Sequence, residues 1–285
     1  MEEKKHRKLF KFLKILIFII IIISIIILYS RYIATTNLNI KEYKVTSNLL
    51  PDNFNGIKIA HISDIHYKST VDRKFLEEIV NEINKTKPDI VVFTGDLIDK
   101  NTVITDEIKN ELIENLSNIE SRLGKYAIKG EDDYNIDEFE DIITKSNFIY
   151  LNDNYDLIYN KGFEPIVIVG LNSSKKSDVS ITDRLNNIDD YEEYNYKLLL
   201  LHEPDYIDNI DYSSFSLILA GSSHGGQIRF PFIGGIIKLN GSKKYTEEKY
   251  TFENTNMYIS FGLGTKNIKY RFMNRPSFNL YRLTK

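Results

Sequence analysis

Cysteine is absent from the 285 residues of this chain. Its absence excludes disulfides, thiolate metal ligands and cysteine nucleophiles, and it suits a protein that works outside the cytoplasm. Histidine is scarce, with five residues in the whole chain, so each imidazole can be weighed individually. The net charge is −3 and basic residues form no stripe beyond the N-terminus, so no electrostatic argument favours binding to nucleic acid.

The remaining composition is that of a globular protein rather than a disordered one. Hydrophobic residues make up 42% of the chain and charged residues 27%. Without an unusual N-terminal segment of about forty residues, roughly 245 residues remain, which is near the upper limit for one large α/β domain. The chain is therefore long enough to bury a sizeable core.

The N-terminal segment has the pattern of a membrane anchor. An uncharged apolar run occupies 15–29, broken by Ser24, and the apolar residues of 9–13 extend it toward the N-terminus. A membrane-spanning helix needs about 20 such residues, and the side chains of Lys11 and Lys14 can reach the headgroups. A cleaved signal peptide is the alternative, but no small-x-small cleavage site follows the run.

The charge of this segment predicts its orientation. Lysine and arginine are concentrated at 4–14. The positive-inside rule places this end in the cytoplasm and everything after Arg31 outside. We therefore predict a single-pass protein of the cell membrane, with its N-terminus cytoplasmic. Its parts are a basic cytoplasmic tail at 1–8, a transmembrane anchor at 9–31, an approach segment at 32–55 and an extracellular domain at 56–285.

The rest of the chain alternates between strand and helix patterns. A short apolar strand is expected at 58–63, an amphipathic helix at 72–85, and a β-branched strand buried on both faces at 90–94. Together they form a strand–helix–strand unit with a parallel crossover. A second helix is expected where apolar residues share one face between Ile108 and Ile119. Further strands are expected at 126–128, 165–169, 198–201 and 217–220.

The C-terminal third has a different pattern, with glycine-containing turns that are typical of hairpins. These turns are at 234–235, 240–241 and 262–264. The polar, acidic stretch at 172–196 lacks strong periodicity, and we interpret it as a surface excursion. The predicted architecture is a mixed α/β fold with a sheet core and an end rich in antiparallel strands.

Side chains that can bind metal follow five of the predicted strands. Because ligands bind at the carboxyl ends of strands in open α/β sheets, these side chains are expected at one edge. In Asp64-Ile65-His66 the carboxylate and the imidazole point the same way if the backbone is extended, and this pair suits a divalent first-row ion. Gly95 allows a sharp turn before Asp96, whose carboxylate could bridge two ions. The residues at the strand ends are Asp64, His66, Asp96, Glu131, His202 and His224.

Each of these residues has an ordinary structural interpretation when it is taken singly. An aspartate after a strand is usually a helix cap or a turn residue, and a histidine after an apolar run is usually a buried, hydrogen-bonded imidazole. We keep that interpretation for His61, which lies inside a strand, and we expect His6 in the basic tail to be solvated. Five strand ends in succession are hard to explain by caps alone, which favours a metal site.

The order of these motifs resembles that of the calcineurin-like metallophosphoesterases, and in particular of their membrane-anchored bacterial branch. The family pattern is D-x-H, G-D, G-N-H-[DE], H and G-H-x-H. The chain has SDIH, TGD, KGEDDY, LLHEPD and GSSHGGQIRFP in that order, and its closing FGLGTKNIKYRFMNRPSFNLYRL is also similar to that branch. The resemblance implies a two-sheet sandwich flanked by helices, in α-β-β-α layers, after one N-terminal transmembrane helix.

The resemblance also implies divalent metal ions, one or two per chain, with Mn, Fe or Zn as the metal. For the second ion the family uses a bridging aspartate and a histidine, which match Asp96 and His202, together with an asparagine and a further histidine. At those last two positions this chain has Glu131 and Ser222. The family's ligands of the first ion match Asp64, His66, Asp96 and His224, which are all present.

The catalytic histidine of the family falls at the position of Asp132. An ionised aspartate cannot donate a proton to the leaving oxygen, and losing one acid typically lowers a rate about 10²–10⁴-fold. Glu131 could replace the amide as an anionic ligand, which would favour Mn²⁺ or Mg²⁺ over Zn²⁺. The alternative is that 131–133 is a solvated acidic turn.

Two functions therefore stay open. The first is a phosphoesterase that hydrolyses phosphomonoesters or phosphodiesters by a metal-bound hydroxide, outside the membrane, on an envelope or lipid phosphate. The alternative is a catalytically impaired pseudoenzyme that binds a phosphate-bearing ligand or a protein partner, which the substitutions at 131, 132 and 222 favour. Arg229 and Arg271 are candidate contacts for the substrate phosphate, with ordinary surface arginines as the alternative.

Overall fold

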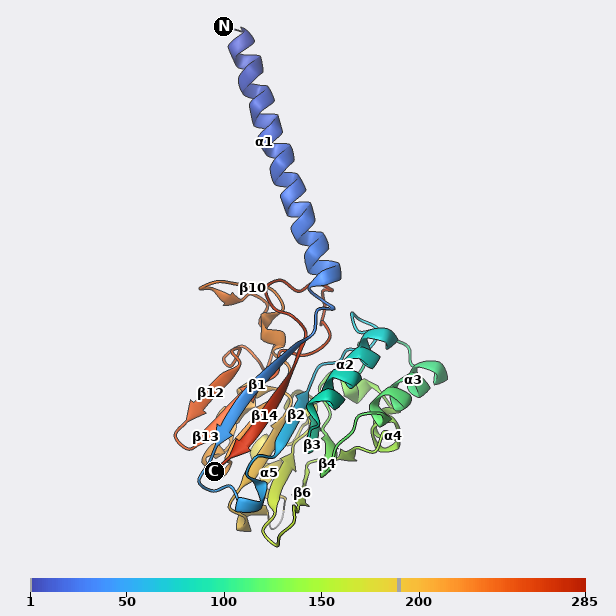
Figure 1. Cartoon of the computed structure of the whole chain (residues 1–285), viewed down its shortest axis with the longest axis vertical. Coiled ribbons are helices and arrows are strands. Elements are labelled where there is room, and N and C mark those ends of the chain that lie inside the picture. The colour runs from blue at the N-terminus through green and yellow to red at the C-terminus, as the bar shows by residue number, and fades with distance from the viewer. Residues whose placement is uncertain (1, 189–190) are drawn as a thin grey trace.

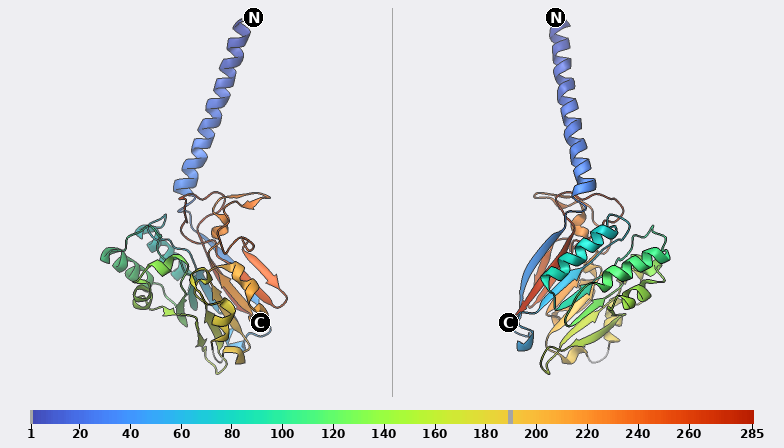
Figure 2. Two further views of the ribbon diagram at one scale, coloured as in Figure 1. Left: turned by 180° about the vertical axis from the view of Figure 1, so that it is seen from behind. Right: turned by 45° about the vertical axis from the view of Figure 1, so that its right-hand side comes forward.

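A computed structural model describes residues 2–188 and 191–285. A long helix, α1 (Glu2–Leu28), continues as a π-helical segment, Tyr29–Ile33, and stands away from the rest of the chain (Figures 1 and 2). Within the described residues, one helix is long and apolar enough to span a membrane; it covers Glu3–Ile33, and an 18-residue stretch of it has a mean hydropathy of 3.1. The N–H of Arg271 donates to the carbonyl of Ser30 at 2.9 Å, which ties the end of this helix to the folded domain.

Two six-stranded sheets form the centre of the domain. The first has the order β1-β14-β2-β3-β4-β5, and the second has the order β12-β13-β9-β8-β7-β6. A short antiparallel pair, β10 (Arg229–Phe230) and β11 (Gly234–Gly235), lies apart from both. The strands of the first sheet are β1 (Asn39–Thr46), β14 (Ser277–Thr284), β2 (Lys58–Ile62), β3 (Ile90–Phe93), β4 (Gly124–Ala127) and β5 (Ile149–Tyr150). Those of the second are β12 (Lys249–Phe252), β13 (Thr255–Ile259), β9 (Leu217–Ala220), β8 (Lys197–Leu201), β7 (Ile166–Gly170) and β6 (Asn154–Ile158).

The two sheets pack face to face and share an apolar core. Ile59 of β2, Val92 of β3, Ile168 of β7 and Leu200 of β8 belong to this core, and each is fully buried. Burying one such side chain contributes about 1.5–3 kcal/mol, so this interface is a large part of what holds the sheets together. All four residues of β3 are buried, as expected for a strand that is covered on both faces.

Helices cover the outer faces of both sheets. α2 (Arg73–Thr86), α3 (Asp106–Ser117) and α4 (Phe139–Lys145) pack on the first sheet through a second apolar cluster (Figure 2). Asp72 begins α2 as its N-cap by accepting the N–H of Phe75 at 2.8 Å. The short helix α5 (Ile181–Asn186) packs on the outer face of the second sheet through a third apolar cluster. These layers confirm the predicted two-sheet sandwich.

The strand directions place one end of the domain beside the membrane helix. β1 begins where the chain leaves α1, and it pairs in parallel with β14. β14 is antiparallel to β2, and β2 is parallel to β3, which is parallel to β4. The carboxyl ends of β2, β3 and β4 therefore lie at the end of the sheet next to α1 (Figure 1). A site built on these strand ends faces the side from which the helix extends.

Most of the predicted elements are confirmed, as β2, α2, β3, α3, β4, β7, β8 and β9. The approach segment differs, because it contains β1: the side chain of Val45 is buried in the core and the main chain pairs with β14. The stretch at 172–196 is more than a surface excursion, because Ile181 and Leu185 of α5 (Ile181–Asn186) are buried. Residues 189–190 of that stretch lie outside the described ranges.

Candidate metal centre

The strand ends bring the predicted metal-binding side chains together. Asp64 and His66 follow β2, Asp96 follows β3, His202 follows β8 and His224 follows β9. Each of the five residues is at most 1% exposed. Their ligand atoms form groups in which all atoms lie within 4.8 Å of one another. Buried carboxylates and imidazoles gathered in this way are a donor set for a divalent cation.

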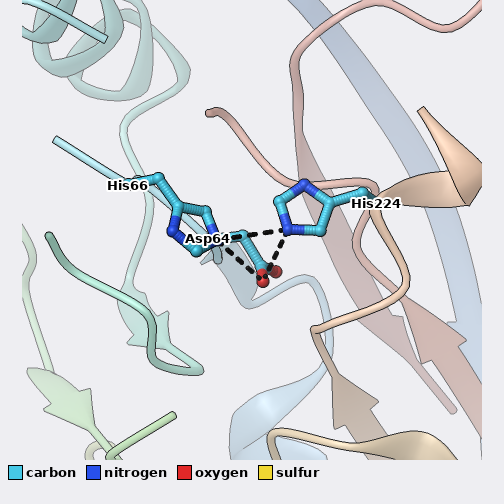
Figure 3. A group of neighbouring side chains, drawn as sticks. All are labelled: Asp64, His66 and His224. Carbon is cyan, nitrogen blue, oxygen red and sulfur yellow. Dashed lines mark hydrogen bonds and ion pairs between the residues drawn. The ribbon is translucent and has the colours of Figure 1, made fainter. Parts of the chain in front are cut away.

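Asp64, His66 and His224 form what we call the first group (Figure 3). Nε2 of His66 lies 3.2 Å from Nε2 of His224. Oδ1 of Asp64 lies 3.3 Å from Nε2 of His224 and 3.9 Å from Nε2 of His66. Figure 3 shows the three side chains pointing toward one another, so that a single ion between them could contact one atom of each.

The backbone after β2 is not extended, which corrects the reason given above for this convergence. Asp64 has a φ of 51° and His66 a φ of 41°, both in the left-handed region. The N–H of Asp64 donates to the carbonyl of Gly95 at 2.9 Å, and the N–H of His66 donates to the carbonyl of Asp96 at 3.0 Å. These bonds join the loops after β2 and β3, and they hold a strained backbone of the kind found at functional sites.

Gly95 is required by the close approach of two loops. Its φ is +93°, and a Cβ added there would lie 2.1 Å from the main-chain nitrogen of Gly130. A Cβ added to Gly130 would in turn lie 2.3 Å from Oδ1 of Asp96. Side chains at these two positions would therefore push the loop after β4 away from Asp96.

Hydrogen bonds orient the carboxylate of Asp64. Its Oδ2 accepts from the hydroxyl of Ser63 at 2.5 Å and from the N–H of Ser222 at 3.0 Å. Its Oδ1 is buried and has no hydrogen-bond partner within the described ranges. An unsatisfied buried polar atom costs about 1–3 kcal/mol, and more when it is charged. A cation held by the first group would remove that cost, so the residues present fit a divalent ion.

Asp96 lies between the first group and His202. Its Oδ2 is 3.5 Å from Nε2 of His66 and 3.4 Å from Nε2 of His202. Nδ1 of His202 hydrogen-bonds the carbonyl of Thr94 at 2.6 Å, and this fixes Nδ1 as the protonated nitrogen. Nε2 of His202 therefore faces Asp96. One oxygen of Asp96 therefore lies close to an imidazole of the first group and to His202.

The close packing of charges shifts the pKa values of these residues. Burial opposes ionisation of Asp64, but the imidazoles of His224 and His202 outweigh burial and lower its pKa. Burial lowers the pKa of His66 to about 3. Burial would also lower the pKa of His202, but Asp96 outweighs it and raises that pKa to about 10. The carboxylate of Asp64 is therefore held ionised and the imidazole of His66 neutral, which are the forms in which these side chains bind a metal ion.

The acidic segment at 131–133 is buried rather than solvated. Asp133, which the sequence analysis did not single out, is fully enclosed. Its Oδ2 accepts from the N–H groups of Asp96 at 2.7 Å and Gly130 at 2.8 Å, and its Oδ1 accepts from the N–H of Leu97 at 2.8 Å. Asp133 therefore holds the loops after β3 and β4 together, beside the metal-binding side chains.

Two lysines that the sequence analysis missed reach into the acidic segment. Nζ of Lys266 is 2.9 Å from Oδ2 of Asp96 and 3.1 Å from Oδ2 of Asp132, and it also contacts Oε1 of Glu131. Lys175 contacts Oε2 of Glu131. Neither lysine lies in an α-helix or a strand, so the pattern of apolar residues does not predict where its side chain points. The one signal for them in the sequence is the surplus of carboxylates at the strand ends, which need positive partners when buried.

The two arginines and the remaining strand histidine lie elsewhere. Arg271 is fully buried and donates to three main-chain carbonyls in 261–264, so it braces the loop beneath Asp64 rather than meeting a substrate. Arg229 forms an ion pair with Glu247 at 2.6 Å. His61 is buried and hydrogen-bonds a threonine hydroxyl at 2.9 Å, in agreement with its structural interpretation.

A family model described as calcineurin-like phosphoesterase matches residues 57–248. The match includes β2, β3, β4, β8 and β9, the strands that carry the metal-binding side chains. The chain belongs to the calcineurin-like phosphoesterases. Members of this family bind divalent metals, and membership points to a hydrolase that acts on phosphate esters.

Individual proteins similar to this chain include two curated relatives and one solved structure. A protein of Bacillus subtilis (strain 168), named uncharacterized metallophosphoesterase YkuE, is 31% identical over 90% of this chain and 88% of its own length. The UDP-2,3-diacylglucosamine pyrophosphatase LpxG of Chlamydia trachomatis is 26% identical and covers 82% of this chain and 86% of its own. A solved structure described as "GAP50 the anchor in the inner membrane complex of Plasmodium" covers 79% of this chain and 80% of its own, with 8% identity and a TM-score of 0.46.

Proposed function

We propose that this chain is a membrane-anchored, metal-dependent phosphoesterase that acts outside the membrane on an envelope or lipid phosphate. The observation that carries the proposal is the first group, in which Asp64, His66 and His224 direct buried acceptor atoms at one point (Figure 3). Asp96 completes this set on the side of His202. These four ligands are the residues that we assign to one divalent cation.

A divalent cation at this position would polarise a phosphoryl oxygen and make a coordinated water more acidic. The chain contributes the orientation of the ligands. Ser63 and the N–H of Ser222 fix the carboxylate of Asp64, and the carbonyl of Thr94 fixes the tautomer of His202. Partners of this kind hold ligands in place before substrate arrives, so little reorganisation is needed during the reaction.

The direction of the site supports a phosphate that is presented at a membrane surface. The strand ends that carry the ligands face the side from which α1 extends (Figure 1). The basic residues at 4–14 favour a cytoplasmic N-terminus and hence an external domain. The name of the Chlamydia trachomatis relative describes a pyrophosphatase of a diacylated sugar nucleotide, which is a lipid-borne phosphate.

The test uses the full-length chain in lipid nanodiscs with Mn²⁺. Release of the leaving alcohol is measured for a soluble phosphomonoester, a soluble phosphodiester and a phospholipid monoester embedded in the same nanodisc. We expect hydrolysis, with the embedded ester preferred. His224→Ala should lower the rate at least about 10²-fold, in the range seen when one transition-state contact is lost. The control His6→Ala removes an exposed imidazole from α1 and should leave the rate unchanged.

Three outcomes would contradict parts of this proposal. Full turnover by His224→Ala would overturn the assignment of the metal ligands. A preference for soluble esters would overturn the membrane-presented substrate. Binding of phosphate without hydrolysis of any ester would favour the alternative function, a phosphate-binding pseudoenzyme.

A further inference from the structure

A lysine ammonium contacts Oδ2 of Asp96, the same oxygen that lies close to His66 and His202. We call Asp96, Glu131, Asp132 and Lys266 the second group. Nζ of Lys266 lies 2.9 Å from Asp96 and 3.1 Å from Asp132, and it contacts Glu131 as well. The side chain of Lys266 is 7% exposed. One buried cation thus already serves three carboxylates at a position next to the first group.

Most carboxylate oxygens around this ammonium already contact an ammonium or a main-chain N–H. Oε1 of Glu131 contacts Lys266, and Oε2 contacts Lys175, so both oxygens of this carboxylate face an ammonium. Oδ1 of Asp96 accepts the N–H of Asp132 at 2.8 Å. Within the described ranges, Oδ1 of Asp64 in the first group has no hydrogen-bond partner, and the same holds for Oδ2 of Asp132 and Nε2 of His202. Oδ2 of Asp132, however, lies 3.1 Å from the ammonium of Lys266. The first group has an acceptor left for an added ion, and the second group has its cation in place.

The main chain holds Lys266 in this position. Its N–H donates to Oε1 of Gln227 at 2.5 Å, and Nε2 of Gln227 donates to the carbonyl of Ile268 at 3.2 Å. Gln227 lies three residues after His224 in the chain. The segment that delivers a ligand to the first group therefore also fixes the loop that delivers the ammonium to the second. This link fixes the position of the ammonium relative to the first group.

We propose that the ammonium of Lys266 takes the place of a second divalent ion, so that this chain holds one divalent ion and one tethered cation. A divalent ion bound by Asp96, Glu131 and His202 would lie directly against Lys266, and the two positive charges would repel each other. Where the site acts on phosphate esters, as proposed above, Lys266 and Lys175 supply the positive charge that a second ion would otherwise supply to phosphoryl oxygens.

The test counts metal ions and does not depend on turnover. The full-length chain is saturated with Mn²⁺, desalted and measured by elemental analysis and by electron paramagnetic resonance. We expect one Mn per chain and the six-line spectrum of an isolated Mn²⁺. Lys266→Met removes the charge at similar length, and we expect it to bind two Mn per chain with an exchange-coupled spectrum. Lys269→Met is the matched control, because Lys269 is exposed in the same loop, and it should stay at one.

Each result has a distinct meaning. Two coupled ions in the unmodified chain would overturn the proposal and leave the phosphoesterase intact. One ion in Lys266→Met would show that Lys266 does not exclude the second ion, and would also overturn the proposal. No ion in the unmodified chain would overturn the proposed function as well. The spectrum of the unmodified chain decides the question even if Lys266→Met fails to fold.

A separate observation concerns the surface beside α1. Five large apolar side chains are exposed there, and we call them the membrane-side surface. Phe232 is 108% exposed, Ile233 75% and Met273 60%. Phe232 and Met273 line one surface hollow, and Met273 lines another together with Tyr29 at the end of α1. The members of the membrane-side surface are Phe230, Phe232, Ile233, Ile236 and Met273.

The arrangement of this surface matches a lipid bilayer as its partner. Figures 1 and 2 show the β10 segment beside the end of α1 that joins the domain, in each of the views. Basic side chains flank the apolar ones, with Lys269 and Arg275 exposed in the neighbouring loop. Exposed aromatic and aliphatic side chains with basic neighbours are the composition of segments that rest in the headgroup region.

We infer that the membrane-side surface rests in the outer interface of the bilayer that α1 crosses. The inference depends on the membrane anchoring that is proposed above. Because His224 precedes β10 by only a few residues, contact of this surface with lipid would place the metal centre at a fixed height over the headgroups. That placement would favour phosphate esters carried by the membrane itself.

The test exploits the absence of tryptophan from the chain. Phe232→Trp introduces a single fluorophore, and the full-length protein is placed in nanodiscs with or without lipids brominated on the acyl chains. Phe163→Trp is the matched control, because Phe163 is 99% exposed and shares a hollow with Lys285 at the far end of the domain. Phe18→Trp reports on α1 itself.

We expect quenching at positions 18 and 232 and none at 163. If the fluorophore at position 18 is quenched but the one at 232 stays as bright as the one at 163, this inference is overturned and the membrane anchoring is not. Absence of quenching at 18 would overturn the membrane anchoring on which the inference depends. A blue-shifted emission at position 232 relative to 163 would support contact with lipid independently.

Discussion

The first and second groups solve the same physical problem in different ways. Each contains at least one buried carboxylate, which is costly unless positive charge lies close by. The first group has imidazole nitrogens 3.2 Å apart and an oxygen of Asp64 that has no hydrogen bond within the described ranges, and together these suit an exchangeable ion. The second group carries its own cation on Lys266. On our proposal, the second group keeps its charge balance without metal because a tethered ammonium reaches its carboxylates.

The largest expected effect comes from breaking the first group. Asp64→Asn removes one negative ligand while keeping the size of the side chain. We expect the rate of phosphate ester hydrolysis to fall about 10²–10³-fold, because the cation that stabilises the transition state is bound less well. Steady-state kinetics and Mn content measured on the same sample check this. A normal rate with normal metal content would contradict the role of the first group.

Removing the metal should lower the stability of the unmodified chain, because one ion is then lost from the first group. A ligand that binds the folded state at 100 times its Kd stabilises by about 2.7 kcal/mol. We expect the melting temperature of the unmodified chain to rise with Mn²⁺ and to fall after chelation, as followed by circular dichroism. Lys266→Met should show a steeper dependence on Mn²⁺, because two ions then bind. Melting that ignores Mn²⁺ in both proteins would contradict the comparison.

Asp133→Asn tests whether Asp133 holds together the loops after β3 and β4, which carry residues of the second group. An amide offers one acceptor oxygen where the carboxylate accepts three N–H bonds, so at least one buried N–H loses its partner. We expect a loss of about 1–3 kcal/mol in the free energy of unfolding, measured by urea denaturation. The control Asp137→Asn changes an exposed aspartate in the same segment and should lose little. Equal stability of the two variants would show that Asp133 is not a support.

The smallest effect is expected at Lys175. Its side chain is 23% exposed and contacts Glu131 from the solvent side of the second group. Lys175→Met should lower stability by only about 0.2–1 kcal/mol, because a partly exposed ion pair is screened by water. Lys176→Met, at the exposed neighbour, is the control. A loss that matches the loss in Lys266→Met would show that the two lysines contribute equally to the second group.

The strands of the sheets and the residues that follow them could be predicted from the sequence, because both depend on the pattern of apolar runs; the assignment of these residues as metal ligands stays a prediction. Apolar runs locate β2, β3, β8 and β9, and the residue after each strand must lie at the same edge of the fold. His202 and His224 were found in this way. The mode of convergence was not predictable, since the left-handed φ of Asp64 depends on its hydrogen bond to Gly95.

Other features depend on contacts between distant residues, which the sequence pattern does not contain. The ammonium of Lys266 meets Glu131 across 135 positions of the chain. In the sequence, Arg271 is a candidate contact for substrate. The structure shows that it is buried and donates to main-chain carbonyls. β1 was placed in an approach segment because edge strands show little periodicity, and its partner β14 lies at the other end of the chain.

The central claim is that one exchangeable ion and one tethered ammonium share the carboxylate of Asp96. The most direct test is anomalous diffraction at the manganese edge, from crystals of the Mn²⁺-loaded chain. We predict one anomalous peak among Asp64, His66 and His224, with Nζ of Lys266 retained beside Asp96. A second peak between Asp96 and Glu131, with the side chain of Lys266 turned away, would contradict the claim.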